Sequence, residues 1–236
     1  MEKAIELKNV AKHYIMGENI VKALDGIDIV INKGEFVALI GPSGSGKSTA
    51  MNLVGSLDRQ TKGAIFLDKR DTSHFRESEL AQVRGRKIGF IFQSFNLIQN
   101  LTAKENVMLP MLFQEVDKYE REERASKLMN LVDLGARMDH YPNQLSGGQQ
   151  QRVAIARALA NDPEIILADE PTGNLDTKTG EKVMGFLKEL NKKGKTIILI
   201  THDNKLAEQA DVVYYIVDGK IKDIRKRIKG KLKKFK

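Results

Sequence analysis

The stretch Gly41-Pro-Ser-Gly-Ser-Gly-Lys-Ser-Thr49 decides the fold class of this chain. It fits the pattern G-x-x-x-x-G-K-[ST] of a phosphate-binding loop, with Gly41, Gly46, Lys47 and Ser48 at the fixed positions. An apolar run, Phe36–Ile40, precedes the loop and is typical of a buried parallel strand. Apolar residues recur at helical spacing from Ser48 to Leu57. The sequence therefore predicts a strand, a glycine-rich loop and a helix, in the order that phosphate binding requires.

The residues of this loop suit a nucleoside triphosphate with Mg²⁺. Glycines let backbone N–H groups turn toward the phosphates, and the helix start adds partial positive charge. We expect Lys47 to reach the β- and γ-phosphates and the Ser48 hydroxyl to bind Mg²⁺. The alternative, a glycine-rich turn beside a helix, is disfavoured by the flanking strand and the lysine. The expected nucleotide contacts are Gly41, Pro42, Ser43, Gly44, Ser45, Gly46, Lys47, Ser48 and Thr49.

Composition narrows the class of protein. The chain has 236 residues, enough for one large domain or for one domain with an inserted subdomain. It has no cysteine, which excludes disulfides and thiolate metal sites. The first residues show no signal-peptide h-region, and no apolar run approaches the roughly 18 residues that span a bilayer. We therefore expect a soluble, cytoplasmic protein.

Positive charge is concentrated at the C-terminus. Of the 39 basic residues, eight lie between Arg225 and Lys236, and the remaining 31 balance the 31 acidic residues of the chain. Apolar residues recur there every three or four positions, which predicts a basic amphipathic helix over 224–236: Ile224, Ile228, Leu232 and Phe235. Such a helix suits anionic lipid, an acidic partner or a phosphate backbone; a frayed tail or a helix docked on its own body is the structural alternative.

Hydrophobic patterning gives the layers of the fold. From Ile5 to Ile31 apolar and polar residues alternate, with breaks at Met16–Asn19 and Asp25–Gly26, which predicts antiparallel sheet. Ala64–Asp68 is expected to join this layer. Lys87–Phe92 is expected to form another strand, and Val212–Val217 to open a closing hairpin.

The second half of the chain alternates strands and helices. Ile165–Ala168 and Thr196–Ile200 are apolar runs separated by a helix, Lys178–Leu190, which indicates parallel strands covered on both faces. Before them, the amphipathic pattern of Glu120–Val132 indicates a helical insertion. We predict an α/β fold, a P-loop NTPase with a mainly parallel central sheet, an N-terminal antiparallel β layer and a helical subdomain inserted at about 94–143. The predicted domain spans residues 1–223.

Two carboxylates end the strand Ile165–Ala168. Asp169 suits a Mg²⁺-associated aspartate, and Glu170, on the opposite face of a strand, suits a water aimed at the γ-phosphate. The alternative is a pair of helix-capping acids.

A second motif is Leu145-Ser-Gly-Gly-Gln149. Ser146 and Gln149 form a capping box, which predicts a helix start. Two glycines in a first helical turn cost about 1 kcal/mol each and expose N–H groups, which favours an anion site.

Together these segments resemble an ATP-binding cassette (ABC) ATPase. Its motifs appear in the family's order and spacing: Gly41–Ser48, Gln93, Leu145–Gln149, Asp169-Glu170, Asp176 and His202. The resemblance extends to about Ile221, and the L-S-G-G-Q signature distinguishes this family from other P-loop proteins. Ala168–Asp176 and Leu101–Val107 look most like the lipoprotein-releasing and macrolide-exporter branch, with a related cell-division ATPase also similar.

The resemblance implies roles for individual residues in a head-to-tail homodimer with two ATPs at its interface. Glu170 matches the general base and His202 the histidine that holds the γ-phosphate. Gln93 matches the glutamine that senses Mg²⁺ and the attacking water. Tyr14 matches the aromatic residue that stacks on adenine. Across the dimer, nucleotide contacts are implied for Ser146, Gly147, Gly148, Gln149 and Asp176, and Mg²⁺ contacts for Ser48, Gln93 and Asp169.

The implied function is ATP hydrolysis that drives a separate integral membrane permease, with docking near Gln93 and the helical insertion. The protein would then be peripheral on the inner face of the cell membrane. One alternative is a force relay without transport, as in cell division. The other is a soluble ATPase acting on nucleic acid. No long coiled-coil insertion or second cassette supports that reading, so no nucleic-acid partner is expected.

Overall fold

The computed structural model describes residues 2–228 and 230–235. The chain forms two compact units, residues 1–80 with 191–236, and residues 81–190. Within the described residues, no helix has both the length and the apolar character needed to cross a membrane.

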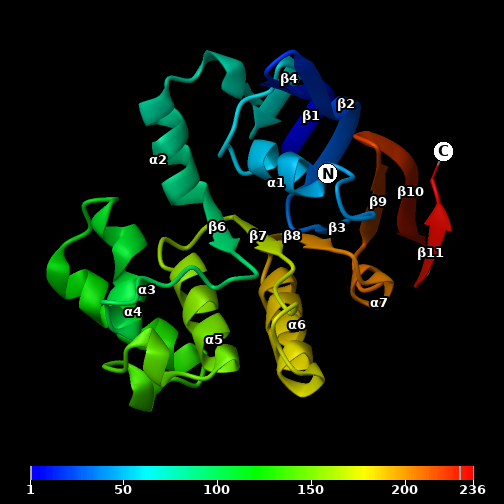
Figure 1. Ribbon diagram of the computed structural model, residues 1–236. Helices are drawn as coiled ribbons and strands as arrows, with labels where there is room; N and C mark the ends of the chain where they lie inside the picture. Colours follow the sequence, from blue (N-terminus) through cyan, green and yellow to red (C-terminus); the bar gives the residue numbers. More distant parts are fainter. Residues whose placement is uncertain (1, 229, 236) are drawn as a thin grey trace. The chain divides into compact units, whose positions relative to one another are not determined.

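The first unit contains a four-stranded antiparallel sheet in the order β2-β1-β4-β5 (Figure 1). Its strands are β1 Lys3–Met16, β2 Asn19–Asn32, β4 Lys62–Leu67 and β5 Arg70–Asp71. The predicted antiparallel layer is confirmed, and the turn at Gly17 is where the first break was expected. The second break is wrong: β2 continues through Asp25 and Gly26, where the register with β1 shifts and Gly26 has φ of 75°. A bulge absorbs the extra residues without ending the strand.

Parallel strands form the core of the same unit. β3 (Phe36–Ile40) lies between β8 (Thr196–Thr201) and β9 (Val212–Val217), parallel to both. Every residue of β3 and β8 is buried, as expected for strands covered on two faces. Three short helices complete this unit: α1 Lys47–Val54, the 3₁₀ helix Thr72–His74 and α7 Asn204–Ala207.

The C-terminal segment is a β-hairpin, so the predicted amphipathic helix is wrong. β10 (Lys220–Ile228) pairs antiparallel with β9, and β11 (Lys231–Lys234) pairs with β10. Gly230 has φ of 78° in the connection, a conformation that suits a turn and not a helix. Ile224 and Ile228 are four apart, a spacing that places residues on one face of a strand as well as of a helix. The pairing with β9 decided between the two.

The second unit is mainly helical around two parallel strands, β6 (Ile88–Ile91) and β7 (Ile165–Asp169). The predicted helices are present as α4 (Lys118–Leu131), α5 (Gly147–Ala158) and α6 (Thr177–Lys192). α2 (Glu77–Lys87), which begins in the first unit, and α3 (Ala103–Leu112) complete the set, with 3₁₀ turns at Gly135–Arg137 and Pro142–Gln144. α3 packs on α4 and α5 over fully buried side chains: Val107, Met111, Ala125 and Met129.

Candidate functional site

The phosphate-binding loop joins β3 to α1 in the first unit. Its backbone passes so close to neighbouring strands that side chains are excluded. A Cβ on Gly41 would stand 1.9 Å from the carbonyl oxygen of Ile216, and one on Gly46 would stand 2.4 Å from that of Ala23. Gly46 also has φ of 102°, in the left-handed region. Close packing of the backbone therefore explains why the sequence pattern has glycine at these two positions.

Polar groups of this loop are arranged for an anion. Lys47 is 8% exposed, and its ammonium donates to the carbonyl oxygens of Gly41 (2.8 Å) and Pro42 (2.7 Å), which holds it over the loop. α1 starts without a side-chain cap and without an acidic residue in its first turn, so its N–H groups remain available. The buried Ser45 hydroxyl has no hydrogen-bond partner among the described residues. This arrangement fits a phosphate chain.

His202 leaves the sheet at the same edge as the loop. Ile40 and Thr201, the last residues of β3 and β8, are paired in register. Gly41 and His202 therefore follow adjoining strand ends, and the His202 side chain is exposed there. The structure brings together the loop and the histidine, although Gly41 and His202 are 161 positions apart in the sequence.

Tyr14 lies on β1, in the same unit, within a small polar network. Its hydroxyl donates to Asp58 Oδ2 (3.0 Å), and its ring is 37% exposed. Lys12 Nζ lies 5.0 Å from the ring centroid and donates to Asp58 Oδ1 at 2.6 Å. Burial and the hydrogen bond to Asp58 raise the pKa of Tyr14 above its ordinary value. Lys12 and Asp58 were not found from the sequence, because a contact 46 residues apart leaves no local signal.

In the second unit, Asp169 is the last residue of β7 and Glu170 begins the following turn. Glu170 has φ of 43°, the left-handed region that costs a non-glycine residue about 1–2 kcal/mol. Its carbonyl oxygen accepts from the Gly173 N–H at 3.0 Å, which closes the turn. Strain of this kind is typical of functional positions. Both side chains are half-buried.

Gln93 lies beside this turn. β6 and β7 are parallel with Ile91 opposite Ala168, so Gln93 and Glu170, each two residues further on, leave at the same sheet edge. The Gln93 carbonyl oxygen accepts from Asn174 Nδ2 at 2.9 Å. A Cβ on Gly173 would stand 2.8 Å from Gln93 Nε2, so the turn and the glutamine are in close contact.

The signature segment opens α5 as predicted. Ser146 Oγ accepts from the Gln149 N–H (3.3 Å) and Gln149 Oε1 accepts from the Ser146 N–H (2.9 Å), which confirms the capping box. The side chain of Gln149 is thus used within the helix start, and its contact with nucleotide stays a prediction. Gly147 and Gly148 form the first turn, where a Cβ on Gly148 would meet Thr179.

Asp176 has a local task at the start of α6. Its carboxylate accepts from the Thr179 N–H (3.0 Å) and from the Thr179 hydroxyl (2.6 Å). These hydrogen bonds hold the pKa of Asp176 below its ordinary value. Its contact with the other chain of a dimer stays a prediction. Thr179 was not found from the sequence, although an aspartate directly before a helix is expected to accept from the backbone N–H of the second or third helical residue.

The predicted Mg²⁺ ligands offer a hydroxyl, an amide and a carboxylate. All three donate through oxygen, the ligand type that Mg²⁺ prefers. Ser48 belongs to the first unit, whereas Gln93 and Asp169 belong to the second. Within residues 2–228 and 230–235 no group of three or more His, Cys, Asp or Glu side chains forms a metal site of its own. The donor atoms of these three residues are therefore of the type that Mg²⁺ prefers, and their joint contact with one ion stays a prediction.

Known proteins resemble this chain over nearly its whole length. A family model described as ABC transporter matches residues 24–173. An uncharacterized ABC transporter ATP-binding protein of Thermotoga maritima is 53% identical, covering 96% of this chain and 97% of that protein. The cassette MJ0796 of Methanocaldococcus jannaschii, solved as a dimer with ADP and Pi, is 50% identical with a TM-score of 0.88, covering 94% of this chain and 98% of that chain.

A further relative combines two functions in one chain. The macrolide export ATP-binding/permease protein MacB of Hyphomonas neptunium is 51% identical over 92% of this chain and 34% of its own length. These similarities confirm the predicted fold class and the branch that the motifs resemble. With its phosphate-binding loop, its strand-end carboxylates and its signature helix in place, the chain belongs to the ABC transporter family as an ATP-binding cassette.

Proposed function

We propose that this chain is the ATP-hydrolysing subunit of an ABC transporter that closes as a head-to-tail homodimer on two ATPs and reopens after hydrolysis. The proposal rests on two groups of functional side chains that lie at the ends of strands. One unit supplies a phosphate cradle with Lys47 and His202, and the other supplies Gln93, Asp169 and Glu170. Hydrolysis requires both a phosphate clamp and a positioned base.

Each residue has a defined part in the reaction. Lys47 and the loop N–H groups hold the β- and γ-phosphates, and Tyr14 stacks on the adenine. Glu170 accepts a proton from the water that attacks the γ-phosphorus, while Gln93 orients that water and His202 holds a γ-phosphate oxygen. When bound by Ser48, Gln93 and Asp169, Mg²⁺ supplies charge compensation on the β- and γ-phosphates. The products are ADP and phosphate.

Pairing places the signature of each protomer against the ATP of the other. Ser146, Gly147 and Gly148 offer a hydroxyl and helix-start N–H groups to the γ-phosphate, with Gln149 holding the cap and Asp176 near the seam. The dimer and bound ADP and Pi in the MJ0796 structure support this arrangement. An ATP-bound state is then more closed than the ADP-bound state, which is how hydrolysis releases the two chains.

The permease partner is proposed to dock near Gln93 and the helical insertion. The insertion keeps Leu97 and Met111 in its core but exposes Ile98, Leu112 and Phe113, the last at 74%. These exposed apolar side chains are the proposed contacts with the permease. A partner in the membrane locates the protein on the cytoplasmic face, for export, lipoprotein release or force transmission. The relatives of this chain are ATP-binding proteins of ABC transporters, which does not favour the nucleic-acid alternative.

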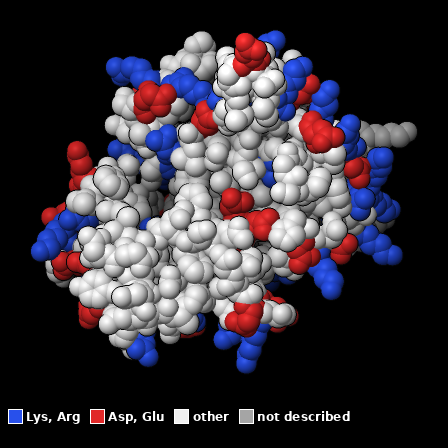
Figure 2. Space-filling view, viewed as in Figure 1, with Lys and Arg blue, Asp and Glu red and all other residues white. Residues whose placement is uncertain are grey.

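The C-terminal hairpin is proposed to face an anionic membrane surface. Directly opposed pairs on β10 and β11 carry like charge, Arg225 with Lys234 and Lys226 with Lys233. Such pairs are destabilising without an anion beside them. Asp223 accepts from Arg225 Nε at 3.0 Å, whereas Lys226 Nζ lies 4.0 Å from the centroid of the Phe235 ring. Arg227 fastens the hairpin to its own unit by donating to the carbonyl oxygens of Ala210 (2.9 Å), Gly230 (3.0 Å) and Glu208. Basic side chains gather at this edge in Figure 2.

The test of the proposed function is ATP-dependent pairing. A Glu170→Gln variant, which keeps the phosphate cradle and loses the base, is expected to accumulate as an ATP-bound dimer.

A further inference from the structure

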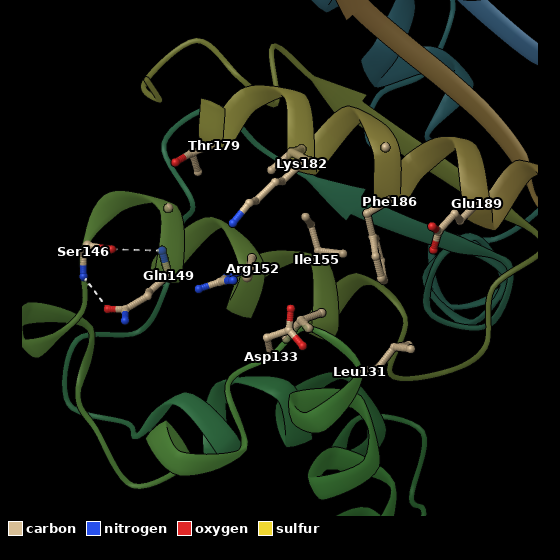
Figure 3. A pocket seen from close by; sticks show the side chains of 14 residues that line it. Leu131, Asp133, Ser146, Gln149, Arg152, Ile155, Thr179, Lys182, Phe186 and Glu189 are labelled. Atoms are coloured by element: carbon tan, nitrogen blue, oxygen red, sulfur yellow. Dashed lines mark hydrogen bonds between the residues drawn. The ribbon is translucent and has the colours of Figure 1, made fainter. Parts of the chain in front are cut away.

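The second unit contains a cavity of about 440 Å³ between α5, α6 and the end of α4. Figure 3 shows its walls: the start of α5 with Ser146 and Gln149 at one end, and Leu131, Phe186 and Glu189 toward the other. Pockets that take small organic molecules have volumes of about 300–1,000 Å³. This cavity is therefore large enough for more than an inorganic ion.

Two cationic side chains point into the middle of the cavity, Arg152 from α5 and Lys182 from α6 (Figure 3). Arg152 is half-buried, and its Nε is fully buried without a hydrogen-bond partner in the described part of the chain. Neither cation forms an ion pair with a described residue, although Asp133 and Glu189 also line the cavity. A partly buried guanidinium without a partner is unfavourable. Lys182 is exposed, so water screens most of its repulsion of Arg152. An anion between the two side chains removes the penalty at Arg152 and attracts the Lys182 ammonium.

Of the other polar groups of the walls, the carboxylates of Asp133 and Glu189 repel an anion, and two hydroxyl groups already take part in hydrogen bonds. Ser146 Oγ accepts from the Gln149 N–H, and the Thr179 hydroxyl donates to Asp176. The cations are therefore the groups left to hold a ligand, and their donors suit the oxygen atoms of a phosphate, sulfonate or carboxylate. Toward the other end, Leu131, Ile155 and Phe186 form an apolar wall that suits a hydrocarbon or aromatic body.

We propose that this cavity binds a small organic anion, with its acidic group between Arg152 and Lys182 and its apolar body against Ile155 and Phe186. Every lining residue belongs to one unit of one chain, so the site is complete without a second copy. The proposal does not depend on ATP hydrolysis. Packing of the arginine stem against apolar wall residues, with its head in water, is the competing explanation.

The test is a fluorescence titration of the full chain with 8-anilinonaphthalene-1-sulfonate, which joins a sulfonate to an aromatic body. The double variant Arg152→Gln, Lys182→Gln should bind the probe at least tenfold more weakly than the wild type. Arg152→Lys keeps the charge and should stay within about threefold. The matched control, Lys178→Gln with Lys188→Gln, removes the same charge from exposed positions of α6 outside the cavity and should stay within twofold.

Competition then separates the two parts of the ligand. Octanoate should displace the probe at least tenfold more effectively than inorganic phosphate, because only octanoate can occupy the apolar wall. Circular dichroism of each variant checks that it is folded, and Lys182→Gln alone, at an exposed position, takes the place of the double variant if that variant is not. Equal probe binding in the wild type and the double variant, or loss of binding in Arg152→Lys equal to that in the double variant, would overturn the proposal.

Discussion

The methyl group of Thr179 lies against Gly148: a Cβ on Gly148 would stand 2.6 Å from Thr179 Cγ2. Thr179 is held in place by both oxygens of Asp176, at 2.6 and 3.0 Å. The first turn of α6 thereby sets the position of the first turn of α5, where the signature residues lie. This contact connects two motifs that the sequence separates by almost 30 residues.

Gly148→Ala is predicted to disturb the signature turn by overpacking. We expect a loss of about 1–3 kcal/mol in the free energy of unfolding and at least a tenfold loss of ATPase activity. Thr179→Ser removes the methyl group but keeps the hydroxyl for Asp176, so adding it should restore most of both losses. Chemical denaturation and steady-state ATPase rates measure them.

The matched control is Gly185→Ala on α6, where an added Cβ has nothing within 4 Å. It should stabilise the helix by about 0.4–1 kcal/mol and leave the rate unchanged. A Gly148→Ala protein as stable and active as the wild type would show that the contact is unimportant.

Gly41→Ala is predicted to abolish nucleotide binding. Its Cβ would overlap the Ile216 carbonyl oxygen, and backbone atoms of a paired strand cannot give way as a side-chain end can. Isothermal titration with ATP should show at least a hundredfold weaker affinity. Gly17→Asn, at the exposed turn between β1 and β2, accepts a residue that tolerates its φ of 62° and should bind as the wild type does. Normal affinity in Gly41→Ala would contradict the assigned role of the loop.

The sequence predicted correctly the helices, strands and loops that are determined by residues close to one another in the chain. The glycine loop between β3 and α1, the capping box of α5 and the buried strands β7 and β8 were all found from residue type and spacing. Residues whose contacts come from distant parts of the sequence were not found. Tyr14 donates to Asp58, 44 residues away in the sequence, and no local sequence pattern near either residue predicts that hydrogen bond.

The C-terminal hairpin shows why an even spacing misleads. Ile224 and Ile228 satisfy both a helical and a strand period, and basic residues around them resemble the polar face of a helix. β9 offered an unpaired edge, and Arg225 and Lys226 pair with Val213 and Val212 there. Tertiary pairing overrode the local pattern.

Asp176 is predicted to make stability pH-dependent in acid. Hydrogen bonds from Thr179 lower its pKa in the folded protein, so its contribution is complete above the unfolded value of 3.8 and is lost as pH falls through the folded pKa. Asp176→Asn should reduce the melting temperature at pH 6 and narrow its gap to the wild type below pH 3.8. Thermal unfolding between about pH 3 and pH 6 measures the difference in melting temperature between the variant and the wild type. A gap that does not change with pH would contradict the role of the charged carboxylate.

The basic hairpin is predicted to bind anionic vesicles. Each basic residue near such a surface contributes about 1 kcal/mol, so Lys226→Gln, Lys231→Gln and Lys233→Gln together should weaken binding by roughly a hundredfold. Co-sedimentation with phosphatidylglycerol vesicles at low salt measures this. Replacing the exposed Lys188, Lys192 and Lys193 by glutamine changes the net charge equally and should have little effect. An equal loss of vesicle binding in both triple variants would show that only net charge matters, and it would contradict a specific role of the hairpin.

Light scattering of Glu170→Gln with Mg²⁺-ATP tests most directly whether two copies clamp the nucleotide between them. Loss of a positioned base should lower the rate of hydrolysis by about 10²–10⁴-fold while ATP still binds. The variant should elute as a dimer of twice 26.5 kDa with ATP and as a monomer with ADP. Glu181→Gln, at an exposed position of α6, should hydrolyse ATP normally and not accumulate as a dimer. A Glu170→Gln protein that remains monomeric while saturated with ATP, or one that turns over at the wild-type rate, would contradict the proposed mechanism.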